Sequence, residues 1–172
     1  LRPLITSLSL AVAAALAQAA PVAEVHALAQ QVHTLIVCVV NAQDVQHVLL
    51  GTTEASQGLL SALQAHYTVM LCPTLSPDDV ENTAAQLMAL QVHTIDAPMS
   101  GGPLRAEQGT MSLMVACEDA VFAAQENLLN TLSSQVFRIS QRVGDGARTK
   151  LVNNLLAGIN LVGAAEVMAL AD

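Results

Sequence analysis

Short apolar runs recur along the chain from residue 35 onwards, and polar turns separate them. The run at 35–40 is rich in β-branched residues and stops at Asn41, which predicts a strand buried on both faces. Similar runs predict further strands at 68–72, 92–95, 111–116 and 136–139.

Between these runs, apolar positions recur at helical spacing. They predict helices at 43–50, 56–65, 77–90, 119–132 and 147–171. The third helix has the clearest start, because Ser76 is a candidate N-cap, Pro77 suits the first helical position and two acids follow.

Strands that alternate with helices at this spacing predict an α/β fold with a parallel, doubly wound sheet. Ligands of such sheets bind beyond the carboxyl ends of the strands. We therefore expect functional residues in the loops at 41–42, 73–74 and 98–102. The sheet pattern gives way to the last helix at 143–146, the one candidate domain boundary.

The composition excludes several classes of protein. Of the 172 residues, 53% are apolar and 12% are charged, which excludes an intrinsically disordered chain. A net charge of −8 disfavours a nucleic-acid partner, and no window has the length and purity expected of a membrane helix. Three scattered cysteines and five histidines without ligand spacing predict neither a disulfide framework nor a metal site. Of the cysteines, Cys38 and Cys72 fall in apolar runs and are expected in the core.

The first 20 residues allow two interpretations. Arg2, an apolar stretch and a small-x-small sequence at 17–19 outline a secretory signal. The interpretation that we favour is an Ala- and Leu-rich helix of a cytoplasmic domain, because nothing downstream predicts disulfides. The chain begins with Leu1 rather than Met, so we expect a fragment or a processed product.

The segment 96–103 contains the first candidate site. A strand that ends in Ser100-Gly101-Gly102 offers backbone N–H groups and a hydroxyl without bulky side chains, which suits a carboxylate or a phosphate. The alternative is a tight turn that needs glycine only for its backbone conformation.

The segment 144–154 contains the second candidate site. Lys150, the only lysine of the chain, precedes Asn154 by four residues, so an ammonium and an amide share one helix face. Burial on an apolar helix would lower the pKa of Lys150 and allow acid–base chemistry. The alternative is a solvated lysine on the helix surface.

Together, the two segments resemble the motifs of the β-hydroxyacid dehydrogenase family, which includes 3-hydroxyisobutyrate and L-threonate dehydrogenases. The family's substrate motif, D-x-P-V-S-G-G-x-x-x-A-x-x-G-T-L, is matched from Asp96 to Met111, with methionine at the V and L positions. The catalytic motif, G-x-G-x-x-x-K-x-x-N-N, is matched from Gly144 to Asn154. Strand 35–40 and the segment 74–77 are also similar to the family's strand-end loops at the cofactor, and the resemblance runs from about Val32 to the C-terminus.

The resemblance implies an NAD(P)-dependent oxidoreductase of small β-hydroxy acids that forms a homo-oligomer. Lys150 would be the general acid/base that exchanges a proton with the substrate during hydride transfer. The implied substrate-binding residues are Ser100, Gly101, Gly102 and Asn154, and those implied at the cofactor, NAD or NADP, are Val40, Asn41 and Thr74.

The resemblance also implies a domain organisation. Residues 1–143 would form a partial, Rossmann-like NAD(P)-binding domain in which 1–25 are unassigned. Residues 144–172 would be the first helix of a truncated C-terminal helical domain.

The chain departs from the family pattern at the dinucleotide. No glycine precedes Gly51, so the motif G-x-G-x-x-G, which places the pyrophosphate at a helix N-terminus, is absent. We therefore expect weak or absent dinucleotide affinity and a tendency to dimerise or aggregate. The alternative function is a non-catalytic remnant or pseudoenzyme.

Overall fold

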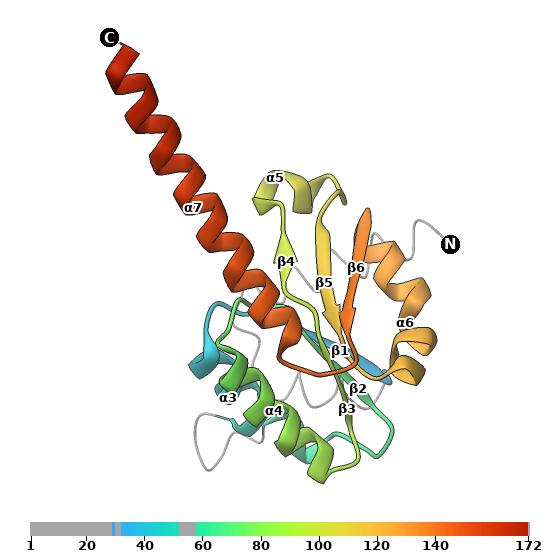
Figure 1. Ribbon diagram of the computed structural model, residues 1–172. Helices are drawn as coiled ribbons and strands as arrows, with labels where there is room; N and C mark the ends of the chain where they lie inside the picture. The colour runs from blue at the N-terminus through green and yellow to red at the C-terminus, as the bar shows by residue number, and fades with distance from the viewer. Residues whose placement is uncertain (1–28, 30–31, 52–57, 172) are drawn as a thin grey trace.

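The computed structural model describes residues 29, 32–51 and 58–171 (Figure 1). The signal-like or helical segment at 1–20 and the start of the helix predicted at 56–65 lie outside these residues. In the rest of 56–65, the prediction is wrong, because only a 3₁₀ helix, η1 (Leu59–Ser61), forms there. The backbone at Gly58 packs directly on the end of the preceding helix, at Leu49, so tertiary contact overrides helical periodicity.

Six strands form one sheet within the described residues. They are β1 (Thr34–Val37), β2 (Thr68–Leu71), β3 (His93–Asp96), β4 (Met99–Ser100), β5 (Ser112–Ala116) and β6 (Gln135–Ser140). The order is β1-β2-β3-β5-β4, and β6 pairs with the other side of β5. All five predicted strands form, and β4 is an addition. The first strand, predicted at 35–40 and buried on both faces, ends at Val37, and only its Leu35 and Val37 are buried.

The first three strands are parallel, and so are β5 and β6, but β5 runs antiparallel to β3 and β4. The cause is the length of the connections. A parallel pair needs a crossover of a dozen or more residues, and α6 (Asp119–Leu132) provides one between β5 and β6. Only the short α5 (Gly102–Glu107) joins β4 to β5, so the chain turns back.

The remaining helices begin where their capping residues predict. In α3 (Ala42–Leu50), the side chain of Asn41 accepts a hydrogen bond from the N–H of Asp44 at 2.9 Å. In α4 (Pro77–Ala89), Ser76 accepts from the N–H of Asp79 at 3.1 Å, which confirms the predicted N-cap.

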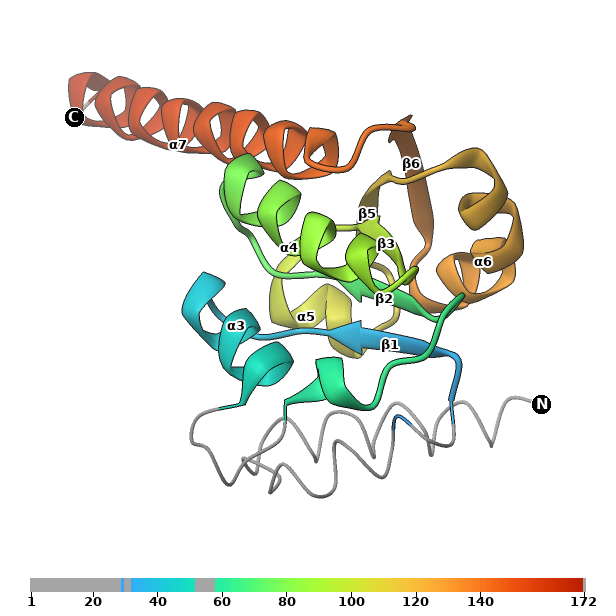
Figure 2. The ribbon, with the colours of Figure 1, turned by 90° about the horizontal axis from the view of Figure 1, so that it is seen from below.

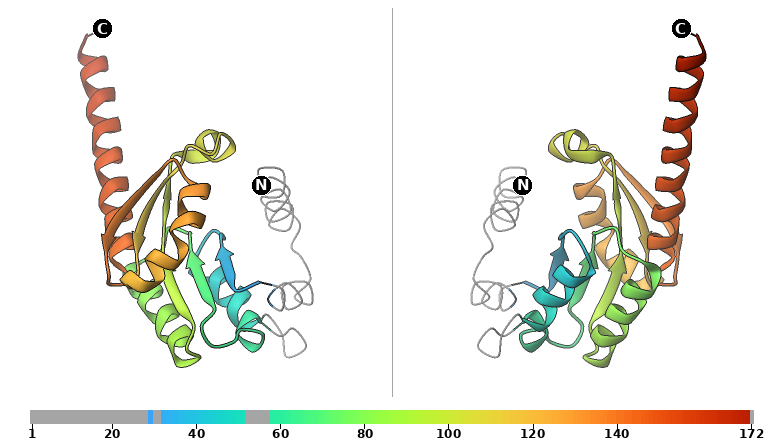
Figure 3. Two further views of the ribbon diagram at one scale, coloured as in Figure 1. Left: turned by 90° about the vertical axis from the view of Figure 1, so that its right-hand side faces the viewer. Right: turned by 90° about the vertical axis from the view of Figure 1, so that its left-hand side faces the viewer.

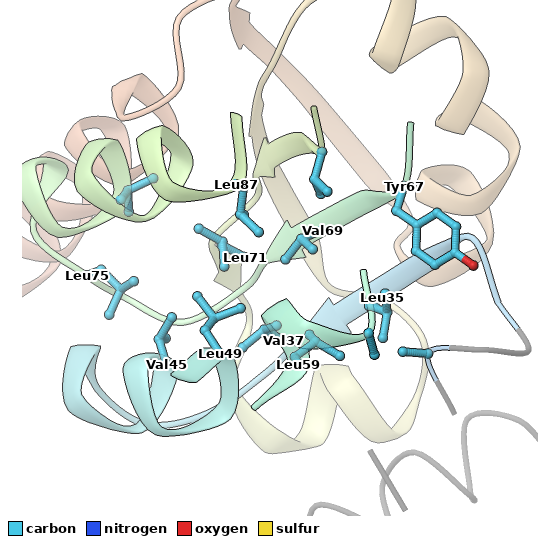
Figure 4. Close-up of a cluster of buried hydrophobic side chains, with 14 of the residues drawn as sticks. Leu35, Val37, Val45, Leu49, Leu59, Tyr67, Val69, Leu71, Leu75 and Leu87 are labelled. Atoms are coloured by element: carbon cyan, nitrogen blue, oxygen red, sulfur yellow. The ribbon is translucent and has the colours of Figure 1, made fainter. Parts of the chain in front are cut away.

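Helices cover both faces of the sheet (Figure 2). On one face, α3, η1 and α4 pack on β1 and β2 around an apolar core that Figure 4 shows in close-up. Its most deeply buried leucines are Leu49, Leu59, Leu71 and Leu87. On the other face, α6 packs on a second core that contains Cys72 and Cys117 and contacts Cys38. The structure thus confirms the predicted Rossmann-like, doubly wound α/β fold.

The last helix, α7 (Asp145–Ala171), lies against the sheet only at its start and then projects away from the domain (Figures 1 and 3). Residues 151–171 are exposed except for the half-buried Asn153.

By length and composition α7 could cross a membrane, because its most apolar window has a mean hydropathy of 1.5. The prediction that no window of the chain meets these criteria is therefore wrong. The polar positions beyond Lys150 are mostly uncharged asparagines, which leave the mean hydropathy high. A helix buried in a protein core meets the same criteria, so α7 alone does not establish a membrane partner.

Candidate active site at the carboxyl ends of the strands

The residues predicted at the cofactor follow two adjacent strands. Register pairs Val37 with Leu71, so β1 and β2 end side by side. Val40 and Asn41 follow β1 and Thr74 follows β2, and all three are exposed, Val40 by 83%. The structure therefore brings the three predicted residues to one edge of the sheet. The Oδ1 atom of Asn41 is already engaged as the helix cap of α3.

The predicted carboxylate-binding segment begins on β4 and enters α5. Ser100 pairs with Ser112 of β5, and Gly101 and Gly102 then adopt φ angles of +135° and +70°. Side chains rarely tolerate such angles, so the turn requires glycine, as the tight-turn interpretation states. The backbone of both glycines is nevertheless exposed, which the carboxylate interpretation needs.

Arg105 is a neighbour of this turn that the sequence did not single out. A Cβ at Gly101 would lie 2.8 Å from Cβ and Cδ of Arg105, so the arginine stem folds back over the turn. The sequence signal was present, because Arg105 lies inside the matched substrate motif, but at a position where the motif specifies no residue.

Lys150 lies on the part of α7 that faces the sheet. The residue is only 8% exposed, and burial lowers its pKa below the ordinary 10.5. The interpretation as a solvated surface lysine is therefore wrong. Its ammonium makes no hydrogen bond or ion pair within the described ranges. Every side-chain nitrogen or oxygen that is fully buried in these ranges does have a hydrogen-bond partner. The ammonium is therefore not completely enclosed, although the residue as a whole is buried. Asn154, one turn later, is exposed.

Asp96 joins the end of β3 to the start of α7. Its Oδ2 atom accepts hydrogen bonds from the N–H groups of Gly144 at 2.9 Å and Ala147 at 3.0 Å. Asp96 is 1% exposed, and this burial raises its pKa to about 6 although the backbone hydrogen bonds oppose the rise. The sequence placed Asp96 in the substrate motif but gave it no role.

Charged side chains hold the first turn of α7 from its other side. Arg148 binds Glu81 of α4 at 2.7 Å and Asp145 at 3.0 Å. Asp145 also accepts a hydrogen bond from Ser140 of β6 at 2.7 Å, and this bond and that of Arg142 lower its pKa. The start of α7 is thus fixed to both α4 and β6.

A dinucleotide fits this arrangement in part. Val40, Asn41 and Thr74, after the ends of β1 and β2, are exposed, as residues that line a nicotinamide would need to be. No glycine-rich turn for a pyrophosphate occurs among the described residues, and the sequence contains no such motif. In the described ranges, no three His, Cys, Asp or Glu side chains form a group that could hold a metal ion.

The fold and its sheet topology define a Rossmann-type α/β domain. The chain belongs to the family described as the NAD binding domain of 6-phosphogluconate dehydrogenase, whose sequence profile matches residues 6–140. This match begins at residue 6, upstream of Val32, where the resemblance to the family's motifs begins.

Individual relatives within this family include hydroxyacid dehydrogenases. L-Threonate dehydrogenase of Escherichia coli K12 is 34% identical over 143 residues, which cover 83% of this chain and 46% of the relative. The crystal structure of 3-hydroxyisobutyrate dehydrogenase from Salmonella typhimurium has a TM-score of 0.73 and 37% identity, and the match covers 85% of this chain and 49% of that one. The structure of Psf3 in complex with NADP+ and 2-OPP has a TM-score of 0.75 and 28% identity over 84% of this chain and 50% of that one.

These comparisons confirm the resemblance to hydroxyacid dehydrogenases and NAD or NADP as the cofactor of the family. The chain spans about half the length of the curated relatives that it matches.

Proposed function

We propose that the chain carries the catalytic lysine of an NAD(P)-dependent oxidoreductase of small β-hydroxy acids, of the 3-hydroxyisobutyrate or L-threonate type. The observation that carries this proposal is the burial of Lys150 against the sheet without a partner among the described residues. A lysine with a lowered pKa supplies the neutral amine that a general base needs. The names of the relatives supply the class of substrate.

A nicotinamide bound beside Val40, Asn41 and Thr74 would supply the acceptor or donor of the substrate's hydride. Lys150 accepts the proton of the substrate hydroxyl in oxidation and returns it in reduction, so charge and protons balance. Ser100, Gly101 and Gly102 bind the substrate carboxylate through a hydroxyl and backbone N–H groups. Asn154, one turn after Lys150, orients the substrate.

The proposed site lacks part of what is needed to bind the cofactor. Val40, Asn41 and Thr74 would line the nicotinamide, but the glycine turn for the pyrophosphate is absent. We therefore propose a low affinity for the dinucleotide. This absence also supports the second candidate function, a remnant or pseudoenzyme that retains only the substrate residues.

The domain boundary, location and assembly are further parts of the proposal. We place the boundary between 143 and 144, because α7 leaves the sheet directly after its first turns (Figure 3). The free thiols of Cys38, Cys72 and Cys117 favour the cytoplasm. The exposed apolar residues of α7 favour a homo-oligomer, which sedimentation at several concentrations would detect.

Titration with NADH and NADPH, followed by nicotinamide fluorescence, tests the proposed function. Wild type and Lys150→Ala are compared for binding and for oxidation of 3-hydroxyisobutyrate and L-threonate. Saturable binding by both proteins, with oxidation only by the wild type, supports the enzyme. Absence of binding by a folded chain up to millimolar cofactor contradicts it and supports the remnant.

A further inference from the structure

We propose that Asp96 is a positioning residue for Lys150: its carboxylate fixes the first turn of α7 on the end of β3, and the helix thereby holds the lysine against the sheet. The catalytic meaning of this contact rests on the proposed function, but the contact itself does not.

The hydrogen bonds place Asp96 where it controls the helix. The first N–H groups of a helix have no partner within the helix, and the Oδ2 atom of Asp96 accepts from two at the start of α7, those of Gly144 and Ala147. Lys150 follows Ala147 by three residues, so both lie on one helix face. Both are also buried, Ala147 to 1% exposure, whereas residues 151 and 152 are exposed.

The packing around this contact leaves the helix little freedom to shift. A Cβ at Gly146 would lie 2.9 Å from the Cγ and Oδ2 atoms of Asp96 and 2.6 Å from the carbonyl oxygen of Met114. The backbone of α7 therefore touches both β3 and β5 at one residue. Loss of the Asp96 carboxylate removes the two hydrogen bonds that join the start of α7 to the end of β3.

The effect of Asp96 on Lys150 acts through geometry rather than through charge. Burial alone lowers the pKa of Lys150, and Asp96 is not among the causes. An acceptor oxygen without a charge should therefore suffice, whereas a side chain without an acceptor should not. The substitutions Asp96→Asn and Asp96→Ala separate these two cases.

The experiment uses the fact that Lys150 is the only lysine of the chain. Labelling lysine with ¹³C gives a single side-chain Cε signal, and its chemical shift against pH reports the pKa of Lys150 without substrate or cofactor. Ser133→Ala is the matched control, because it removes another buried polar group, at the end of α6, whose hydroxyl donates to the carbonyl of Leu129.

We expect the pKa of Lys150 to rise toward 10.5 in Asp96→Ala and to stay at the wild-type value in Asp96→Asn and Ser133→Ala. The proposal is overturned if Asp96→Ala folds with an unchanged lysine titration, or if Asp96→Asn shifts it as far as Asp96→Ala does. It is also overturned if Ser133→Ala produces the same rise.

A second variant covers the case in which Asp96→Ala does not fold. Gly146→Ala leaves Asp96 in place and pushes the helix away from it, so the pKa of Lys150 should rise as well. An unchanged titration in folded Gly146→Ala contradicts the proposal. Since no step needs turnover, failure here is separate from failure of the proposed dehydrogenase, which the cofactor titration decides.

Discussion

The carbonyl oxygen of Met114 lies 2.6 Å from the position that a Cβ on Gly146 would occupy. Backbone cannot move aside as a flexible side chain can, so Gly146→Ala overpacks the contact between α7 and β5. Overpacking a buried contact costs about 1–3 kcal/mol, and we expect a loss of that order in the free energy of unfolding.

Gly158→Ala is the matched control for this prediction. Gly158 lies in the same helix, but a Cβ there meets nothing within 4 Å. The gain in helix propensity should leave this variant unchanged or more stable by up to about 1 kcal/mol. Urea unfolding of both variants measures the difference, and a Gly146→Ala protein as stable as Gly158→Ala would refute the close approach.

The buried carboxyl of Asp96 should make stability depend on pH. Its pKa is raised from 3.8 to about 6, so between these values the folded state keeps a proton that the unfolded chain has released. The stabilisation is complete below pH 3.8 and is lost as the pH rises through 6. A difference of this size corresponds to about 3 kcal/mol.

Asp96→Asn isolates this effect, because an amide does not titrate. We expect the free energy of unfolding of the wild type, relative to that of Asp96→Asn, to fall between about pH 4 and about pH 6.5 and then to level off. Urea titrations across this range provide the measurement. A relative stability that is flat, or that increases with pH, would show that hydrogen bonding outweighs burial at this carboxyl.

Substitution of Gly101 should weaken the binding of the substrate. Alanine is strained at a φ of +135°, and its Cβ would lie 2.8 Å from Arg105. We expect Gly101→Ala to displace the start of α5 and to raise the KM for a β-hydroxy acid about tenfold or more, which equals about 1.4 kcal/mol.

Gly109→Ala serves as the comparison for Gly101→Ala. Its φ is +66° and the space around it is open, so it should lose stability without a comparable rise in KM. Equal KM values for the two variants would remove the Ser100-Gly101-Gly102 turn from the proposed substrate site.

The sequence predicted those features that depend on local chemistry. The Ser76 cap and the helix at 119–132 follow from capping and periodicity, and the structure confirms both. The apolar run at 35–40 also forms a strand, but this strand ends at Val37. The sequence missed α5, which buries no residue and therefore has no apolar periodicity.

Features that depend on distant contacts could not be predicted in this way. Asp96 and Gly144 are 48 residues apart, and nothing near either residue indicates that they bind each other. Lys150 and the more exposed Arg148 lie on the same helix, and only packing on the sheet distinguishes them. The sequence therefore identified the lysine but left its burial open.

Replacing Lys150 should separate stability from catalysis. Lys150→Met keeps the length and apolar stem of the side chain but removes an ammonium that has no partner in the described ranges. Partial burial disfavours the charged form of Lys150, so we expect the free energy of unfolding of Lys150→Met to stay unchanged or to rise by about 1 kcal/mol. The rate of β-hydroxy acid oxidation should fall by about 10²–10⁴-fold, because methionine exchanges no proton.

Lys150→Arg is the control for this prediction. A guanidinium keeps the charge but does not deprotonate, so this variant should lose both rate and stability. Retained oxidation in Lys150→Met would exclude the lysine as the general acid/base, whereas a large loss of stability would mean that the ammonium binds a stabilising partner.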